Sequence, residues 1–588
     1  MKNLNLVLCA FLVGCITSVA QTFKTDMVFD AMDAEIQRSM RELTIGDLAR
    51  PYHIEALLKV RRAATAHAVL GIVEDRDSGL YLSLSVRVRV GTPKFDNTNF
   101  FDVSLGFFGS ADDEESYKNR RIPFELDETT LRRELWLALD AAYKQSVEAY
   151  AKKESALKNR TRTDTTWDFA FLPGNTVTAA RELPRPNQKA IVETVEKLSA
   201  IFRSYPTIQT SRVGMEVVPE EQYYVNSEGR RFYKTESFTG IEVIATTQAA
   251  DGMPLAQTYA AYAPTPQQLP NIDSLQRAVT GVATRLAAMV DAPLIEPYSG
   301  PVLFVGSAAA GVVGQFFAPN LVAQRQPLSE GGFSTGDRNR AFQNKIGARV
   351  LPEWLSVADV PSRARDNGRP VAGHYVLDEE GLQAEDITLV DKGYLKTLLS
   401  SRVPTKRIAA SNGHLRGGGA MFSVIDVTCS DPKRALSAAD LKKRLLKLLK
   451  DRDLPYGIIV RNTMDQNLLF TGVLRQLGSD LPISQGDGKI GLLEAYRVFP
   501  DGREELLRGV EAAGISPATF KDILAVSRTT TVHNFLAPSV IPSFITGGSS
   551  YLISTVICPD LLFEDCEVRP LEGDMPKPPS LTNPIAGE

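Results

Sequence analysis

Strict alternation of apolar and polar residues over 80–90 constrains the fold of this chain more than any other sequence feature. Serines and arginines alternate there with five apolar residues: Leu82, Leu84, Val86, Val88 and Val90. A side-chain period of two is that of a strand with one buried and one solvated face, as in antiparallel sheets. The sequence therefore predicts an antiparallel strand that is entered through a turn at Asp77-Ser78-Gly79 and packs one face on a core.

Other segments of the first half repeat their apolar residues every three or four positions, which is the period of a helix with one buried face. Asp26 is a suitable N-cap for the first, whose apolar face carries Val28, Met32, Ile36, Met40 and Leu43. Three further helices are predicted at about 128–158, 187–203 and 272–291. Asn226 and Gly229 favour a hairpin turn within 223–229.

Prolines at 293, 297 and 301 mark the main predicted boundary, because a helix cannot continue through them. Short alternating runs and glycine turns predominate afterwards, with one clear helix at about 436–452. We therefore expect an α+β protein. Its predicted parts are a mixed α/β domain over 21–292, a largely antiparallel β domain over 293–570 and a disordered Pro-rich tail over 571–588.

Residues 1–20 have the features of a secretory signal peptide. Lys2 precedes an apolar run from Leu4 to Ala20, and Ser18-Val19-Ala20 carries the small residues that signal peptidase accepts. A second interpretation also fits, because Leu12-Val13-Gly14-Cys15 resembles a lipobox and would place a lipid anchor on Cys15. Both interpretations predict export to the periplasm or cell envelope.

Charge and cysteine content exclude several classes of function. The chain has 66 lysines and arginines against 70 aspartates and glutamates, so we expect no nucleic-acid partner. The acidic run 112–115 is interpreted as a solvated loop, because adjacent carboxylates repel one another. Five scattered cysteines do not suggest a disulfide scaffold. A disulfide between Cys558 and Cys566 would require the intervening chain to turn back on itself.

Short motifs of the second half follow one order. They are Gly300-Pro301-Val302-Leu303-Phe304, a small-residue helix from Gly306 to Phe317, turns at 373–381 and 390–395, an Asn-Gly-rich loop at 411–417, and a closing strand at 554–564. In this order they resemble the TldD/PmbA family over about 300–565, with a looser similarity in the first half. The resemblance implies a mixed α/β N-terminal half and a largely β C-terminal half.

The resemblance also implies what an active site would contain. Catalytic members of the family carry His-Glu-x-x-x-His on the helix after the Gly-x-Val-Leu strand, with both histidines on zinc and the glutamate as general base. Here Val305 and Ala310 occupy the histidine positions and Gly306 the glutamate position. The family's third ligand, a downstream Cys in a Cys-Gly segment, has no match either. We therefore predict a degenerate zinc site, with no catalytic residue, no metal and no cofactor.

Members without this motif are of the TldE/PmbA type, which is thought to pair with a zinc-bearing partner. The resemblance therefore implies a homo- or heterodimer, a zinc-bearing TldD-like paralogue as partner, and peptide substrates. Small residues on the helix would let an extended peptide lie in the former cleft. Gly311, Gly314, His414 and Arg416 are the residues expected along that groove. A purely structural helix packed in the core is the alternative.

Our leading hypothesis is thus a non-catalytic scaffold or peptide-binding subunit. Two alternatives stay open: an active metallopeptidase with unrecognised ligands, and a stand-alone protein that binds cell-envelope peptides or glycans. The metallopeptidase would draw its metal ligands from His374, Asp378, His414, Cys429 and His533. Their spacing does not place any two of them on one face of a helix or strand. Ser307 lacks the Gly-x-Ser-x-Gly context of a hydrolase nucleophile, and the glycines after Arg416 are weak evidence for an anion-binding loop.

Overall fold

The computed structural model describes residues 23–101, 120–158, 164–329, 339–464, 488–541, 549–573 and 575–586. The predicted signal peptide, the lipid anchor on Cys15 and the acidic run 112–115 lie outside these residues. Among the residues described, no helix combines the length and the apolar character that a membrane span requires.

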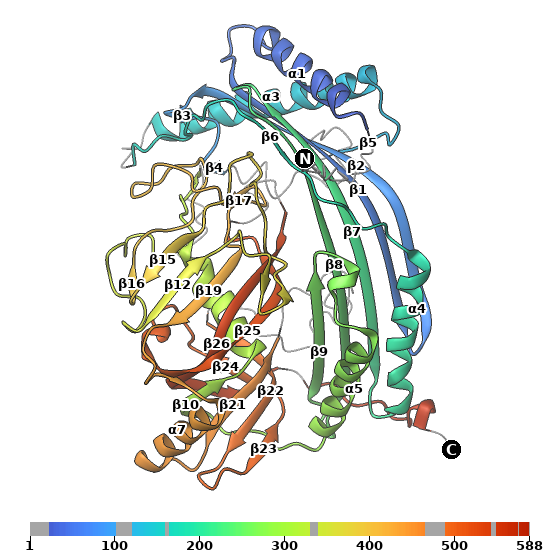
Figure 1. Cartoon of the computed structure of the whole chain (residues 1–588), viewed down its shortest axis with the longest axis vertical. Helices are drawn as coiled ribbons and strands as arrows, with labels where there is room; N and C mark the ends of the chain where they lie inside the picture. Colours follow the sequence, from blue (N-terminus) through green and yellow to red (C-terminus); the bar gives the residue numbers. More distant parts are fainter. Residues whose placement is uncertain are drawn as a thin grey trace, which may run out of the picture.

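An eight-stranded sheet dominates the first half of the chain (Figure 1). Its long strands follow the order β2-β1-β7-β8 and are antiparallel to their neighbours. They are β1 (Pro51–Val69), β2 (Ile72–Thr92), β7 (Thr210–Asn226) and β8 (Arg231–Gln248). The shorter strands are β3 (Phe95–Asp96), β5 (Arg120–Ile122), β6 (Thr176–Ala179) and β9 (Pro254–Ala263). β5 pairs with β2, whereas β6 and β9 pair with successive parts of β8.

Four helices cover one face of this sheet and bury its apolar residues. They are α1 (Thr25–Glu42), α3 (Glu128–Lys158), α4 (Gln188–Ser199) and α5 (Ile272–Met289), with 3-10 turns at Ala200–Ser204 and Pro266–Gln268. Figure 1 shows α1 and α3 at one end of the sheet and α4 and α5 towards the other. The apolar even-numbered residues of β1, from Ile54 to Ala68, pack under these helices. The odd-numbered residues of β1 therefore point to the opposite face.

A twelve-stranded sheet forms the second half. Its strands are β10 (Tyr298–Phe304), β12 (Leu355–Asp359), β15 (Ile387–Asp391), β16 (Tyr394–Leu395), β19 (Val424–Cys429), β20 (Ala435–Leu436), β21 (Gly457–Thr463), β22 (Ile490–Val498), β23 (Glu504–Leu507), β24 (Val510–Ala513), β25 (Ile523–Pro538) and β26 (Tyr551–Pro570). Most pairs are antiparallel, and the parallel ones are β10 with β21, β19 with β26, and β20 with β25. The predicted α+β class is thereby confirmed.

Short elements complete the second half. Two-stranded pairs are formed by β4 (Phe100–Phe101) with β11 (Leu328–Ser329), β13 (Arg365–Asp366) with β14 (Arg369–Pro370), and β17 (Leu415–Arg416) with β18 (Gly419–Ala420). The helical elements are α6 (Ser307–Val312), a π-helical turn at Val313–Phe317, α7 (Ala438–Asp451), and 3-10 turns at Ala318–Leu321, Thr519–Asp522 and Pro584–Ala586. The helices predicted near 306–317 and 436–452 are therefore present.

One predicted turn and one predicted helix cap need correction. The alternating apolar residues 82–90 are buried as expected, but Asp77-Ser78-Gly79 lies inside β2 and pairs with β1. The hairpin turns instead at Leu70-Gly71, where both residues have positive φ, 51° and 74°. A two-residue turn of this kind matches the twist of long paired strands. Similarly, α1 begins at Thr25 after Lys24, which places Asp26 in its first turn and not at the N-cap.

The C-terminal tail makes contacts that its composition did not predict. The Gln248 amide donates to the Pro576 carbonyl oxygen at 2.9 Å, and the Asn583 amide donates to the Pro206 and Ile208 carbonyl oxygens at 3.0 and 3.3 Å. Prolines lack an N–H group but keep their carbonyl acceptors, so a Pro-rich segment can still be held by side-chain donors. Residues 575–586 therefore lie along the first half of the chain.

Candidate functional site

The positions of the degenerate zinc motif lie where β10 passes into the helical segment. Gly306 has φ 60° and ψ −124°, and the helix begins only at Ser307. The N–H group of Gly306 donates to Asp560 Oδ1 at 2.8 Å. Val305 and Gly306 therefore precede the helix, and only Ala310 lies on it. A backbone at this positive φ is one that residues with a side chain rarely adopt.

The small residues of the helix allow strands of the core to approach closely. Ala308, Ala309 and Ala310 are completely buried. A Cβ atom added to Gly311 would lie 2.8 Å from Thr463 Oγ1 of β21, and one added to Gly314 would lie 2.6 Å from the Phe535 ring of β25. These two predicted groove residues thus face β21 and β25 inside the core.

The other candidate metal ligands are engaged separately; they are His374, Asp378, His414, Cys429 and His533. Within the described ranges, no three His, Cys, Asp or Glu side chains gather where they could hold a metal ion. The Asp378 carboxylate instead accepts hydrogen bonds from the N–H groups of Glu380 and Leu382, both at 2.9 Å. The His414 ring is completely buried, with Nδ1 2.9 Å from the Asn412 carbonyl oxygen. These residues do not fit a zinc ion.

The considered disulfide between Cys558 and Cys566 does not form. Both thiols are free and lie on the single strand β26. Eight residues of strand separate the two Cα atoms by about 26 Å, well beyond the reach of a disulfide. Burial raises the pKa of the Cys566 thiol to about 12, which favours the unreactive thiol form.

A cavity of about 810 Å³ lies between the eight-stranded sheet and the second half of the chain. Lys59, Arg61 and Ala63 line it from β1, on the face opposite the helices. Alternate residues of β7 and residues 234–238 of β8 continue this wall, and the opposite wall comes from residues 371–379, Arg416 and the start of β26. The volume falls within the roughly 300–1,000 Å³ of small-ligand pockets.

Arg416 and His414 meet around one tyrosine at the cavity. The Arg416 guanidinium lies 5.0 Å from the centre of the Tyr375 ring, and it donates to the carbonyl oxygens of Phe422 and Ile553 at 2.8 and 2.7 Å. The His414 ring packs against the same tyrosine at 6.2 Å, edge to face. Of the four predicted groove residues, Arg416 lines the cavity and His414 supports the tyrosine behind it.

Most charged groups on the sheet wall are paired with one another. Arg61 donates to the Glu220 carboxylate, and Lys59 lies 3.9 Å from the same carboxylate. Lys234 donates to Glu236 at 2.9 Å. Sequence reasoning missed these residues because the polar face of an alternating strand has the same pattern whether it meets solvent or encloses a cavity. The alternating strand pattern was the only sequence feature that pointed to these residues.

The polar face of β2 was predicted to be solvated, but part of it is buried. Arg89 is buried, donates to Asp96 Oδ2 at 3.0 Å, and lies 3.7 Å from the centre of the Phe169 ring. Its side chain is covered by the segment that follows α3. A cation removed from water needs such a carboxylate partner, which alternation alone cannot reveal.

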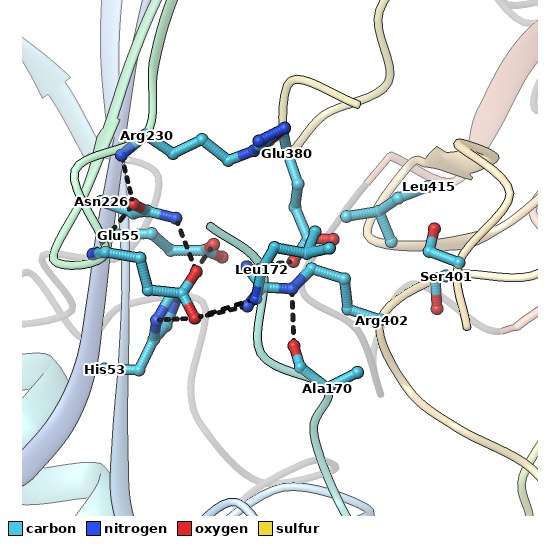
Figure 2. A network of polar contacts seen from close by, with 12 residues as sticks. His53, Glu55, Ala170, Leu172, Asn226, Arg230, Glu380, Ser401, Arg402 and Leu415 are labelled. Atoms are coloured by element: carbon cyan, nitrogen blue, oxygen red, sulfur yellow. Dashed lines mark hydrogen bonds and ion pairs between the residues drawn. The ribbon is translucent and has the colours of Figure 1, made fainter. Parts of the chain in front are cut away.

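A buried polar network joins the two halves next to this arginine (Figure 2). Arg402 is 1% exposed and donates to Glu228 Oε1 at 2.7 Å and to the Ala170 carbonyl oxygen at 2.9 Å. From the first half, Arg230 donates to the Glu380 carbonyl oxygen at 3.2 Å. These contacts fix the loops around residues 380 and 402 against the β7–β8 hairpin, and so hold the far wall of the cavity in place.

Glu380 within this network gives a pH-dependent prediction. Burial, together with Glu55 and Asp378 nearby, raises the pKa of Glu380 to about 8. The folded protein therefore keeps a proton that the unfolded chain releases near its ordinary pKa, so this group lowers stability as the pH rises from about 4.5 to about 8. We expect Glu380→Gln to gain a few degrees in melting temperature over the wild type between pH 5.5 and pH 8.

Glu379 provides the matched control for that prediction. Burial alone would raise the pKa of Glu379. The pKa is nevertheless lowered, because Lys59, Arg87 and the N–H groups of Gly417 and Gly418 stabilise the carboxylate. A lowered carboxyl pKa stabilises the fold above the ordinary pKa and loses that effect as the pH falls. Glu379→Gln should therefore be more harmful at pH 7 than at pH 4. Parallel melting curves for the two variants across this range would contradict the assignment of both groups.

The C-terminal part of the chain matches a known family model. Residues 298–569 match the PmbA/TldA metallopeptidase C-terminal domain. A Metalloprotease PmbA homolog of Haemophilus influenzae is 26% identical over 118 residues, which cover 20% of this chain and 23% of that protein. The chain therefore aligns with about a quarter of the length of this curated relative.

Solved structures share the fold over nearly the whole chain. A protein described as a modulator of a DNA gyrase, from Thermotoga maritima, has a TM-score of 0.55 and 12% identity, covering 92% of this chain and 99% of that one. TldE from Thermococcus kodakarensis has a TM-score of 0.54 and 14% identity, with the same two coverages. A modulator of DNA gyrase from Bacteroides thetaiotaomicron has a TM-score of 0.56 and 11% identity, covering 93% and 98%. Residues 298–569 thus match the PmbA/TldA metallopeptidase C-terminal domain, and the chain as a whole shares the fold of these solved structures.

Proposed function

We propose that this protein is an exported, non-catalytic member of its family that binds peptides beside a zinc-bearing relative. The observation that carries the proposal is the chemistry at the motif positions. Val305, Gly306 and Ala310 provide neither a metal ligand nor a general base. Ala310 is also completely buried, so the side chain at the second histidine position is enclosed by the core. These positions therefore support no zinc-dependent step.

The cavity between the two halves is the proposed peptide site. Its walls combine apolar side chains with charged groups that are mostly paired, which suits an extended chain of mixed composition. Residues 235–238 of β8 line this cavity. Along β8 they follow the part that pairs with β6 and precede the part that pairs with β9. No described strand pairs with residues 235–238 on that side of β8, so a peptide that crosses the sheet wall can hydrogen-bond to the main chain there.

Export and partnership follow from separate observations. The apolar segment before Gln21 supports export, with either a cleaved signal peptide or a lipid on Cys15. A TldE protein is among the solved structures with this fold, which supports a pairing of the TldD/TldE type. The proposed assembly is a homodimer or a heterodimer with a zinc-bearing TldD-like paralogue, which would carry out the proteolysis.

Peptide binding and zinc content test this function together. The purified protein should contain less than stoichiometric zinc, should not hydrolyse an unfolded peptide by itself, and should bind a fluorescein-labelled peptide in an anisotropy titration. Ala63→Trp should weaken that binding because the indole takes up part of the cavity, whereas Ala151→Trp on the exposed side of α3 should not change it. One zinc per chain together with hydrolysis by this chain alone would overturn the proposal. Peptide binding by a protein that stays monomeric and without a companion would favour the stand-alone alternative.

A further inference from the structure

Apart from Arg416, which donates to two carbonyl oxygens, three arginines line the cavity without a carboxylate partner among the residues described. They come from separate elements: Arg121 from β5, Arg181 from the segment after β6, and Arg365 from β13. Each of the three is exposed. Arg121 stacks on the ring of Tyr81 at 4.4 Å, Arg181 donates to His374, and Arg365 donates to the Gly368 carbonyl oxygen at 3.0 Å. None of these contacts neutralises the positive charge.

The other exposed charges of the cavity do not offset these arginines. The lysines and Arg61 on the sheet wall are paired with Glu220 and Glu236. The Glu379 carboxylate, whose charge the N–H groups of Gly417 and Gly418 stabilise, is only partly exposed. Glu182 and Glu216 line the cavity and form no ion pair among the described residues. Glu216 is only partly exposed, and burial raises its pKa. Among the exposed charged side chains that line the cavity, those without an ion pair in the described residues are the three arginines and Glu182, so the exposed unpaired charge is mainly positive.

The spacing of the arginines suits an extended chain more than a single anion. Arg121 lies at the β2 edge of the sheet, opposite Ser83, whereas the backbone of Arg181 is bonded to Thr235 of β8. From β5 to β6 the sheet order is β5-β2-β1-β7-β8-β6, and five strand spacings amount to about 24 Å. An extended peptide spans that distance with about seven residues.

We propose that this cavity selects acidic peptides, with glutamates or aspartates that contact Arg121 and Arg181 about seven residues apart and Arg365 from the opposite wall. The proposal rests on the peptide-binding function above. Arginine suits this role because its planar guanidinium binds a carboxylate through two parallel hydrogen bonds.

The test compares three fluorescein-labelled ten-residue Gly-Ser peptides that carry four glutamates, four glutamines or four lysines. We expect the glutamate peptide to bind about tenfold more tightly than the glutamine peptide at low salt, because three exposed ion pairs contribute modestly and additively. The difference should shrink in about 0.5 M NaCl, since salt screens exposed charges. Arg121→Gln with Arg181→Gln and Arg365→Gln should remove the preference. Arg50→Gln with Arg277→Gln and Arg407→Gln, which change the net charge equally outside the cavity, should retain it.

The outcomes separate this inference from the function on which it rests. Equal binding of all three peptides would overturn the acidic selectivity while peptide binding stands. Failure of every peptide to bind would overturn the peptide-binding function itself. An equal loss of preference in both triple variants would assign the effect to net charge and would also overturn selection by the cavity. Matching thermal melts of the two triple variants show that neither result comes from misfolding.

Discussion

Replacing Lys153 by methionine is expected to lower the free energy of unfolding by about 3–5 kcal/mol. Lys153 of α3 is completely buried and donates to Asp168 Oδ2 at 2.7 Å and to the Asp96 carbonyl oxygen at 2.8 Å. The variant leaves the Asp168 carboxylate, itself completely buried, without the Lys153 ammonium. Arg325, 3.0 Å from Asp168, and the N–H group of Asp96, which donates to it at 2.9 Å, would remain as partners. Urea unfolding followed by circular dichroism measures the loss.

The neighbouring lysine gives a matched control. Lys152 is partly exposed and lies 2.9 Å from Glu148 one helical turn away. Lys152→Met removes the same charge from the same helix, but an exposed pair of this kind contributes at most about 1 kcal/mol. If Lys153→Met lowered the free energy of unfolding as little as Lys152→Met, the buried lysine would not stabilise this region.

Restoring the zinc motif by Val305→His, Gly306→Glu and Ala310→His is expected to destabilise the fold without creating a zinc site. At Gly306 the positive φ makes any side chain strained, which costs about 1–3 kcal/mol. At Ala310 a larger side chain overpacks a completely buried position, at a cost of about 1–3 kcal/mol. Thermal melting and metal analysis after dialysis against zinc measure both effects.

The single variants identify which substitution causes the loss of stability. Val305 is only partly buried and precedes the helix, so Val305→His should be the mildest of the three. Gly306→Ala tests the backbone alone, because an added Cβ would meet only Thr531 Oγ1 at 3.9 Å. A stable triple variant that binds one zinc per chain would show that the degenerate site still has the geometry of a metal centre, and would contradict the expected strain at Gly306 and Ala310.

Local sequence pattern predicted much of the fold. The period of two over 82–90 and the helical periods of α1, α3, α4 and α5 each specify one apolar face, because burial of that face requires the matching backbone geometry. Turn composition was less reliable. Asp77-Ser78-Gly79 has typical turn residues, yet it lies within β2 because pairing with β1 continues to Leu70-Gly71.

Residue identity by itself determined the loss of the zinc motif, since valine, glycine and alanine cannot bind a metal in any fold. Only the tertiary structure decided where a ligand can bind. The two polar faces that enclose the cavity come from segments separated by hundreds of residues, and the pattern of a polar strand face does not change when another part of the chain covers it. Arg121, Arg181 and Arg365 carry no common motif. They share a cavity because sheet pairing brings β5 and β6 to opposite edges of one wall, while β13 approaches from the other half.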